Sequence, residues 1–323
     1  MLGSAGEISF PENWISKGFE SLAQNLDRFR GCLLGLAVGD AVGTTVEFMP
    51  RGSFPKMTDM VGGGPFHLEA GQWTDDTSMA LCLATSLIEK KRFDPADQMD
   101  RYWDWYKKGY LSSTEICFDI GNTVRYALER YHRMGNPFSG SDSPNSAGNG
   151  SLMRLAPIPM FYFSDREQVI HFAGESSRTT HGALECIEAC QLFTEMIYHT
   201  LSGKDKDQIL FDTKVEISSP KIKFIADGSY SSRPMNQIHG TGYVVESLEA
   251  ALWCFYKTDS FEEAILQAAN LGDDADTTAA ICGQLAGAFY GEVGIPEKWL
   301  SKLHMRNEIT NLADHFIEMS DAL

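Results

Sequence analysis

Basic residues are scarce in this 323-residue sequence, which has 27 Lys and Arg against 44 Asp and Glu and a formal net charge of −17 at pH 7. Such an excess of negative charge repels the phosphates of nucleic acids and of anionic membranes, so neither is an expected partner. The shortage of bases also limits how a phosphate-bearing ligand could bind. It would have to rely on backbone N–H groups or on metal ions.

Paired cysteines are absent as well. The 7 cysteines are scattered and form no Cys-x-x-Cys pair; Cys186 and Cys190, one helical turn apart, have no His or Cys partners at zinc-ligand spacing and are predicted to be small core residues. Scattered thiols fit a reducing compartment. The first 20 residues include three glutamates and no apolar core, and no apolar run reaches the length of a transmembrane span. We therefore expect a cytoplasmic protein.

Alternating β-strand patterns are also rare, and only residues 215–217 and 222–225 are short candidates. Apolar residues instead recur at helical spacing in four segments, 79–87, 186–201, 243–255 and 276–290. The many small residues between positions 31 and 39 predict a helix that packs closely on others. The pattern predicts a single all-α domain, residues 27–323, after an N-terminal extension, residues 1–26. Residues 203–240 form a connection longer than most, which predicts a functional or mobile segment.

Two acidic segments are the most informative part of the sequence. Residues 71–77 (GQWTDDT) and 272–278 (GDDADTT) each follow a glycine and precede an apolar helical run. Helix capping is the simplest interpretation, because Thr and Asp cap helices well and acids favour the first turn. Each segment, however, holds more carboxylates than a cap uses, and crowded carboxylates repel one another unless cations bind. Together they indicate a site for Mg²⁺ or Mn²⁺, which prefer oxygen ligands.

With these two segments in place, the chain resembles the ADP-ribosylglycohydrolase family, which includes the dinitrogenase reductase-activating glycohydrolase and the ADP-ribosyl-arginine and -serine hydrolases. The resemblance covers residues 28–295, about as far as the motifs extend. Each motif alone is weak, but eight in the family's order are specific. They are residues 30–41, Glu47, and residues 73–77, 119–123, 148–154, 180–181, 242–245 and 272–277.

The resemblance implies an all-α fold, a single-domain orthogonal helical bundle, with two Mg²⁺ or Mn²⁺ ions. Some family members read Gly-Gly-Asp-Thr-Asp-Thr at the second acidic motif, where this chain has Asp273 and Ala275. Activity is still expected, because the ligands survive; Asp273 would then support a ligand or cap the helix. By motif, the implied metal ligands are Thr74, Asp75, Asp76, Asp274, Asp276 and Thr277.

The implied substrate is an ADP-ribosylated protein, with arginine as the expected acceptor. The glycines of residues 146–151 would let consecutive backbone N–H groups at a helix start reach the pyrophosphate. For each contact a structural alternative stays open: a Gly/Ser loop that Arg154 holds internally, a buried histidine, or a core aromatic ring. The substrate contacts assigned to this part of the site are Gly148, Asn149, Gly150, Ser151, Met153, His181 and Tyr243.

Asp119 and Asn122 are assigned to the arginine side of the cleft, because the matching pair in arginine-specific relatives lies there. Their i, i+3 spacing predicts that both lie on one helix face; a surface or capping acid is the alternative for Asp119. For the general base, the candidates are Glu47, a metal-ligand aspartate (Asp76 or Asp274) and a metal-bound hydroxide. The sequence does not choose among them.

Three other interpretations fit parts of the sequence. Residues 274–278 match the Asp-x-Asp-x-Thr of haloacid dehalogenase-type phosphatases, but a helical run precedes them. All-α prenyl-transferring enzymes need a second-turn aspartate where this chain has Met79. The third interpretation uses the same fold: an immunity protein that binds an ADP-ribosyltransferase toxin through residues 1–26 or 203–240. We expect a monomer.

Overall fold

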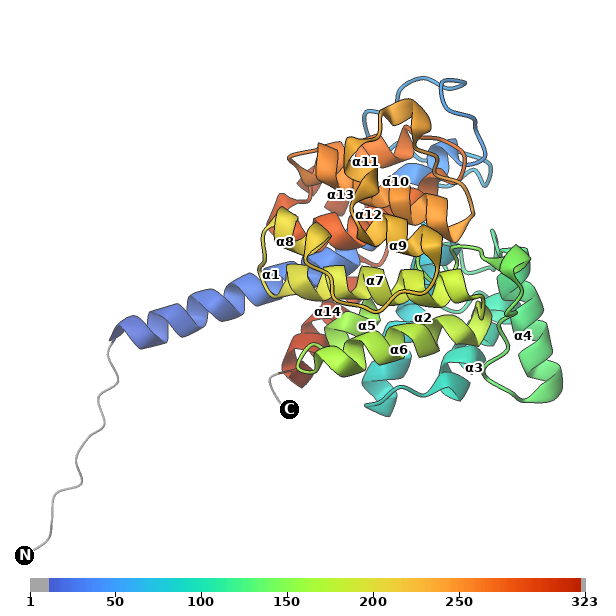
Figure 1. The fold of residues 1–323 in the computed structure, drawn as a ribbon, viewed down its shortest axis with the longest axis horizontal. Helices are drawn as coiled ribbons and strands as arrows, with labels where there is room; N and C mark the ends of the chain where they lie inside the picture. The colour runs from blue at the N-terminus through green and yellow to red at the C-terminus, as the bar shows by residue number, and fades with distance from the viewer. Residues whose placement is uncertain (1–11, 321–323) are drawn as a thin grey trace, which may run out of the picture.

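The computed structural model describes the backbone of residues 12–320 and the side chains of residues 23–320. Within these limits the protein is a bundle of helices, and β-pairing is confined to three isolated bridges, which confirms the predicted all-α class (Figure 1). The α-helices are α1 (Glu12–Gly43), α2 (Asp75–Lys90), α3 (Pro95–Lys108), α4 (Asn122–Met134), α5 (Pro157–Phe161), α6 (Arg166–Thr180), α7 (Leu184–Leu201), α8 (Lys206–Phe211), α9 (Pro220–Ala226), α10 (Val244–Lys257), α11 (Phe261–Ala269), α12 (Ala275–Tyr290), α13 (Glu297–Leu300) and α14 (Arg306–Ser320). Short 3₁₀ helices join some of them, among them Thr44–Val46 and Pro144–Ser146.

The central contact of the bundle joins α1 and α12, which run antiparallel with their backbones touching. Four residues of α1, each one turn after the last, face four residues of α12. At every one of these positions a Cβ atom would overlap a carbonyl oxygen of the other helix, so only glycine fits on α1. The facing pairs are Gly31–Gly287, Gly35–Gly283, Gly39–Ala279 and Gly43–Ala275. This contact places the end of α1 beside the start of α12.

The N-terminal helix differs from the expectation in two ways. Helix α1 begins at Glu12 and continues without a break past residue 26, the predicted boundary of the extension; residues 1–11 lie outside the described chain. The segment Ala23–Val46, most of which is α1, is long and apolar enough to cross a membrane by length and composition, so the expectation that no such run exists was wrong. Of an apolar 18-residue stretch within it, 89% is buried in the protein, as in the core helix of a bundle.

The long connection after α7 is fixed to the bundle by two buried carboxylates. Glu188 accepts the backbone N–H groups of Ser218 and Ser219 at 2.8 and 2.7 Å. Further along the same helix, α7, Glu195 accepts the backbone N–H groups of Lys214 and Val215 at 2.7 and 3.1 Å. Two helices, α8 and α9, lie in this segment; α9 includes residues 222–225, so the short strand considered there was wrong, as was the one at residues 215–217.

We predict that Gly35→Ala lowers the free energy of unfolding by about 1–3 kcal/mol, the usual result of overfilling a packed interior. Its Cβ would overlap the Gly283 carbonyl and lie 2.9 Å from the Gly287 Cα. Urea denaturation measures the change. Gly121→Ala is the matched control, because nothing lies within 4 Å of the added methyl group. Equal unfolding midpoints for the two variants would contradict the close α1–α12 contact.

Candidate active site

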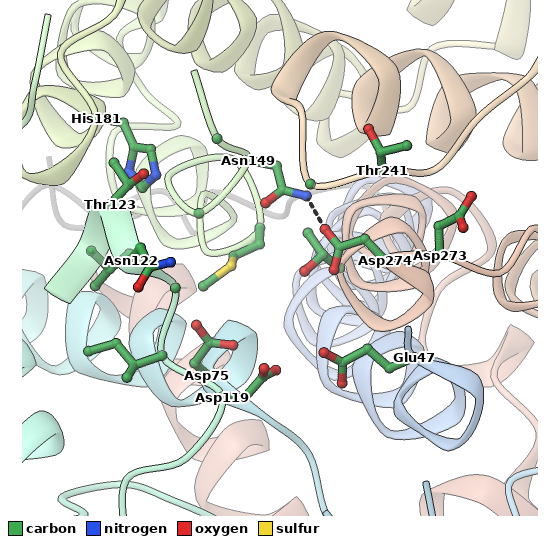
Figure 2. Close-up of a pocket in the computed structure, with 18 of the residues that line it drawn as sticks. Glu47, Asp75, Asp119, Asn122, Thr123, Asn149, His181, Thr241, Asp273 and Asp274 are labelled. Atoms are coloured by element: carbon green, nitrogen blue, oxygen red, sulfur yellow. Dashed lines mark hydrogen bonds between the residues drawn. The ribbon is translucent and has the colours of Figure 1, made fainter. Parts of the chain in front are cut away.

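The site lies where the end of α1 meets the starts of α2 and α12. Seven carboxylates gather around these three helix ends, and Figure 2 shows four of them facing one cavity of about 730 Å³. Asp40 and Glu47 come from the end of α1 and the turn after it, and Asp119 comes from the loop before α4. The first turns of α2 and α12, with the residue before α12, supply the other four: Asp75, Asp76, Asp274 and Asp276. The predicted convergence of the two acidic motifs is therefore present.

The interpretation of the acidic motifs as helix caps was wrong. Thr74 and Asp274 occupy the N-cap positions of α2 and α12, yet neither side chain makes a capping hydrogen bond. The start of α2 is capped by Asp40 of α1 instead. Its Oδ1 accepts the Thr74 N–H at 2.9 Å, and its Oδ2 accepts the N–H of Thr77 at 3.0 Å and the Thr77 hydroxyl at 2.6 Å. The carboxylates of α2 are therefore not needed to cap the helix.

Sequence analysis assigned no role to Asp40, although one signal was available. It is the one charged residue in the run from Gly31 to Val42, and all the others are small or apolar. A charge at such a position is buried, and a buried charge needs partners. Burial raises the pKa of Asp40 to about 6, against the opposing effect of its hydrogen bonds from Thr77 and Thr74.

The base of the site is built from carboxylates whose oxygen atoms lie close together. Oxygen atoms of Asp40, Asp76 and Asp276 lie within 4.8 Å of one another, and so do those of Glu47, Asp119 and Asp276. Two of these oxygens, Oδ1 of Asp76 and Oδ1 of Asp276, are buried without a hydrogen-bond partner. None of the ion pairs formed by side chains between residues 23 and 320 includes any of the seven acids.

Burial without a counter-charge changes the acidity of these groups. Burial, together with Asp119, raises the pKa of Asp75 well above its ordinary value, and burial with Glu47 does the same for Asp276. Burial and the neighbouring Asp119 raise the pKa of Glu47 to about 10, and burial with Asp274 raises that of Asp119 to about 7. Such a cluster is costly unless cations bind it. Oxygen-only donors and orphaned carboxylate oxygens fit Mg²⁺ or Mn²⁺.

The predicted metal ligands divide into two groups by position. Asp75, Asp274 and Thr277 line the cavity. Thr74, Asp76 and Asp276 are buried behind them, with the Thr74 hydroxyl 3.0 Å and the Thr277 hydroxyl 3.3 Å from Asp76 Oδ2. All six are oxygen donors; three of them line the cavity and three lie behind its wall.

The other end of the cavity is formed by the 148–150 loop, Met153 and His181. Figure 2 shows His181 on the far side of the cavity from Glu47, with Asn149 between them donating to Asp274 Oδ2 at 2.6 Å. No helix starts at this loop, which corrects the prediction for residues 146–151, since α5 begins only at Pro157. The N–H groups of Gly148 and Asn149 donate to the Ser146 and Gly242 carbonyls at 2.9 and 3.1 Å.

Two predicted substrate contacts do not line the cavity. Ser151 is buried behind the loop, where its Oγ lies 2.9 Å from the Ser177 hydroxyl. The Tyr243 hydroxyl donates to Glu185 and accepts from Lys221 Nζ at 2.6 Å, away from the cavity lining. The backbone of Tyr243 still serves the site, because it forms a bridge with Gly148 that holds the loop.

Asp119 and Asn122 both line the cavity, but they do not share a helix face as predicted. Helix α4 begins at Asn122 with Gly121 as its N-cap, so Asp119 precedes the helix. Its φ of 58° turns the chain before the helix starts. The i, i+3 pattern could not reveal this turn, because it depends on a single left-handed residue.

Left-handed backbone also marks the cavity rim elsewhere. Phe48 and Asp273, with φ of 63° and 57°, both line the cavity, and the structure holds them by reciprocal backbone hydrogen bonds. The Phe48 N–H donates to the Asp273 carbonyl at 2.7 Å, and the Asp273 N–H donates to the Met49 carbonyl at 2.9 Å. Strained residues of this kind cluster at functional sites. Asp273 thus lines the cavity instead of capping α12, and Phe48, which is 65% exposed, was missed by sequence analysis.

Comparisons with known proteins find similar sequences and a similar structure. A sequence model of the ADP-ribosylglycohydrolase family matches residues 21–322. The ADP-ribosylarginine hydrolase Tri1 of Pseudomonas putida is 45% identical over 91% of this chain and 79% of its own length. The protein of the same name from Serratia proteamaculans is 43% identical over 92% and 81%.

A more distant relative and a solved structure extend the match. The ADP-ribosyl-[dinitrogen reductase] glycohydrolase of Rhodospirillum rubrum is 34% identical over 87% of this chain and 92% of its own. A solved structure titled "ADP-ribosylglycohydrolase-related protein complex" superposes with a TM-score of 0.82 at 42% identity. That match covers 92% of this chain and 99% of the other, so the whole bundle is shared.

We predict that, without divalent cations, raising the pH from about 4 to about 7 lowers the free energy of unfolding. The folded protein keeps a proton on Asp119 up to a pKa of about 7, above the ordinary 3.8, so it binds more protons than the unfolded chain in that window. The stability that protonated Asp119 contributes is fully present below its pKa in the unfolded chain. It is lost as the pH rises through its pKa in the folded protein.

Thermal unfolding at pH 5 to 8, with EDTA or with Mg²⁺, measures this dependence. Cations that bind only the folded protein should raise the unfolding temperature, and more at pH 8 than at pH 5, where protons compete for the carboxylates. An unfolding temperature that is the same with EDTA and with Mg²⁺ or Mn²⁺ at pH 8 would count against a metal site.

Proposed function

The chain belongs to the ADP-ribosylglycohydrolase family, and on this premise we propose that it hydrolyses the N-glycosidic bond between ADP-ribose and arginine in a modified protein. The observation that carries the proposal is the meeting of the α2 and α12 starts around carboxylates that form no ion pair with any side chain between residues 23 and 320. The two relatives at 43–45% identity, each named an ADP-ribosylarginine hydrolase, support arginine as the acceptor.

The site is proposed to hold two divalent cations, Mg²⁺ or Mn²⁺. Their ligands would be Thr74, Asp75, Asp76, Asp274, Asp276 and Thr277, which provide only hard oxygen donors. Bound ions would supply Lewis-acid polarisation of the sugar oxygens beside the scissile bond and of the attacking water. Asp40 keeps this set in place by capping α2, so that Asp75 and Asp76 stay free for the cations.

Among the side-chain candidates for general base, the cavity favours Glu47; a metal-bound hydroxide stays as the alternative. Asp76 lies behind the cavity wall, and Asp274 is engaged by Asn149, whereas Glu47 faces the cavity from the turn after α1. Without cations, a pKa of about 10 keeps a proton on Glu47, whereas cations bound nearby would favour its carboxylate form. In the proposed reaction this carboxylate takes a proton from water as the water oxygen bonds to the anomeric carbon. The carbon–nitrogen bond breaks, its electron pair stays on the guanidine nitrogen, and that nitrogen receives the proton that Glu47 removed from water, so arginine leaves as a guanidinium and Glu47 returns to its carboxylate form.

Asp119 is proposed to bind the leaving guanidinium group. Its carboxylate lies close to Glu47, next to the scissile bond in this arrangement, and it faces the cavity from the opposite wall. Neutral guanidine is a strong base, with a conjugate-acid pKa of about 12.5–13.8, so the group carries a positive charge when it departs. A carboxylate at this position stabilises that charge and binds a neutral serine hydroxyl less well. The ADP part would lie toward Gly148, Gly150, Met153 and His181 at the far end.

Inhibition of an ADP-ribosyltransferase toxin by direct binding is a second proposed role, as an immunity protein. Its support is the first part of α1, which extends beyond the helical body in Figure 1. We expect the protein to be a monomer in the cytoplasm. Deleting residues 1–26 and measuring the affinity for the toxin tests this role. Unchanged affinity would leave hydrolysis as the one function.

Removing a ligand carboxylate should abolish hydrolysis. We predict that Asp75→Asn and Asp276→Asn each lower the rate of ADP-ribose release from ADP-ribosylated arginine at least about 100-fold. Loss of a group that only supports a metal ligand already costs roughly 10–100-fold. Asp207→Asn, an exposed aspartate on α8, is the control and should keep full activity. Full activity in EDTA, or in either ligand variant, would rule out the metal mechanism.

The acceptor preference can be tested through Asp119. We predict that Asp119→Asn lowers kcat/KM for ADP-ribosyl-arginine roughly 10–100-fold more than for ADP-ribosyl-serine, the effect of one hydrogen bond between charged groups. Parallel assays of the two substrates, with wild type and variant at equal Mg²⁺, give the ratio. An equal loss on both substrates would mean that Asp119 acts on the metals instead of on the leaving group.

A further inference from the structure

Arg154 is a fully buried cation that does not reach the cavity. It is 0% exposed, although it follows Met153, which lines the cavity directly. Its guanidinium lies 4.7 Å from the centre of the Tyr102 ring and donates to the Gly150 carbonyl at 2.9 Å through Nη1. Through Nη2 it donates to the Thr180 hydroxyl at 2.8 Å. Arg154 therefore touches both walls that face the ADP end, the loop and the end of α6.

The Thr180 hydroxyl links Arg154 to His181, because it contacts both side chains. Its Oγ1 lies 2.8 Å from His181 Nδ1, and these two contacts are the ones it makes within the described chain. A guanidinium only donates, so the Thr180 oxygen accepts from Arg154 and its hydrogen remains for Nδ1. The opposite arrangement would leave a buried hydroxyl hydrogen without an acceptor, which is unfavourable.

We propose that Arg154 and Thr180 are positioning residues that fix His181 in the tautomer with the proton on Nε2. This nitrogen then points an N–H at the cavity as a donor to an oxygen atom of the ADP-ribosyl group; the identity of that ligand rests on the proposed function. His181 lines the cavity beside the 148–150 loop, and its Nε2 has no hydrogen-bond partner in the described part of the protein.

Two further features keep the imidazole in this state. Burial, with the nearby Arg154 charge, lowers the pKa of His181 to about 3, so the ring is neutral in the working range. Gly150 leaves room for the ring edge, because a Cβ there would lie 2.9 Å from Cε1 and 3.2 Å from Nε2. At Gly148 the same atom would meet Nε2 at 3.4 Å, an ordinary contact. The glycine at position 150 thus serves the histidine.

Nitrogen-15 NMR of histidine-labelled protein tests the tautomer without any substrate. In the wild type, the His181 resonances should show a protonated Nε2 and an unprotonated Nδ1, assigned with His181→Gln. Thr180→Val removes the hydroxyl at nearly constant shape and should give a mixture of tautomers, whereas Thr180→Ser should restore the wild-type pattern. A protonated Nδ1 in the wild type, or an unchanged tautomer in Thr180→Val, would overturn the proposal.

ADP-ribose affinity, measured by calorimetry at saturating Mg²⁺, tests the consequence. Thr180→Val should raise Kd roughly tenfold, as for the loss of one hydrogen bond, and Thr180→Ser should return it to within about twofold. In Thr179→Val, a matched control, the lost hydroxyl touches Arg154 but not His181, so tautomer and affinity should persist. Equal affinities for Thr180→Val and wild type would refute the relay. A wild type that fails to bind ADP-ribose would instead refute the proposed function, while the NMR result still decides the tautomer.

Discussion

Backbone contact between α1 and α12 is the constraint on which the site depends. Four glycines at one-turn spacing on α1 let the two helices touch, and the last contact, Gly43 against Ala275, lies at the first residue of α12. A side chain there would separate the helices and move the α12 carboxylates away from those of α2. The glycines therefore set the distance between the carboxylates of α2 and α12. This distance matters because a cation can be shared only if donors from both helices reach it.

The carboxylate cluster makes the folded protein less stable than a neutral site would be. Asp75, Asp76 and Asp276 are buried, and no ion pair among the described side chains offsets their charge. The rest of the bundle must supply that stability, and its core includes fully buried Trp73 and Trp105. Left-handed residues at the rim add to the cost. Natural sites carry such costs where function requires them, so the gathering of buried, unpaired carboxylates at one cavity is itself an argument for catalysis.

The sequence predicted those features that depend on residues close together in the chain. Helices α2, α7, α10 and α12 follow from apolar spacing, and the acidic motifs follow from their excess of carboxylates. What it could not predict depends on tertiary contacts. Asp40 caps α2 through Thr74, the N-cap residue 34 positions later in the chain. Glu188 and Glu195 fix the connection whose length predicted a functional or mobile segment. Their partners are backbone N–H groups, which leave no pattern in the sequence.

The burial of Arg154 resolves a conflict between the two ends of the cavity. In the proposed function the ADP end binds a pyrophosphate in a protein of net charge −17, and an exposed arginine would be the direct solution. An exposed guanidinium in the same cavity, however, would form ion pairs with Glu47, Asp75 or Asp274 and so compete with the proposed cations for them. Kept behind Thr180, the charge of Arg154 instead orders the loop and orients a neutral imidazole. A neutral donor binds an anionic oxygen without competing for the carboxylates, so both ends of the cavity remain available to one substrate.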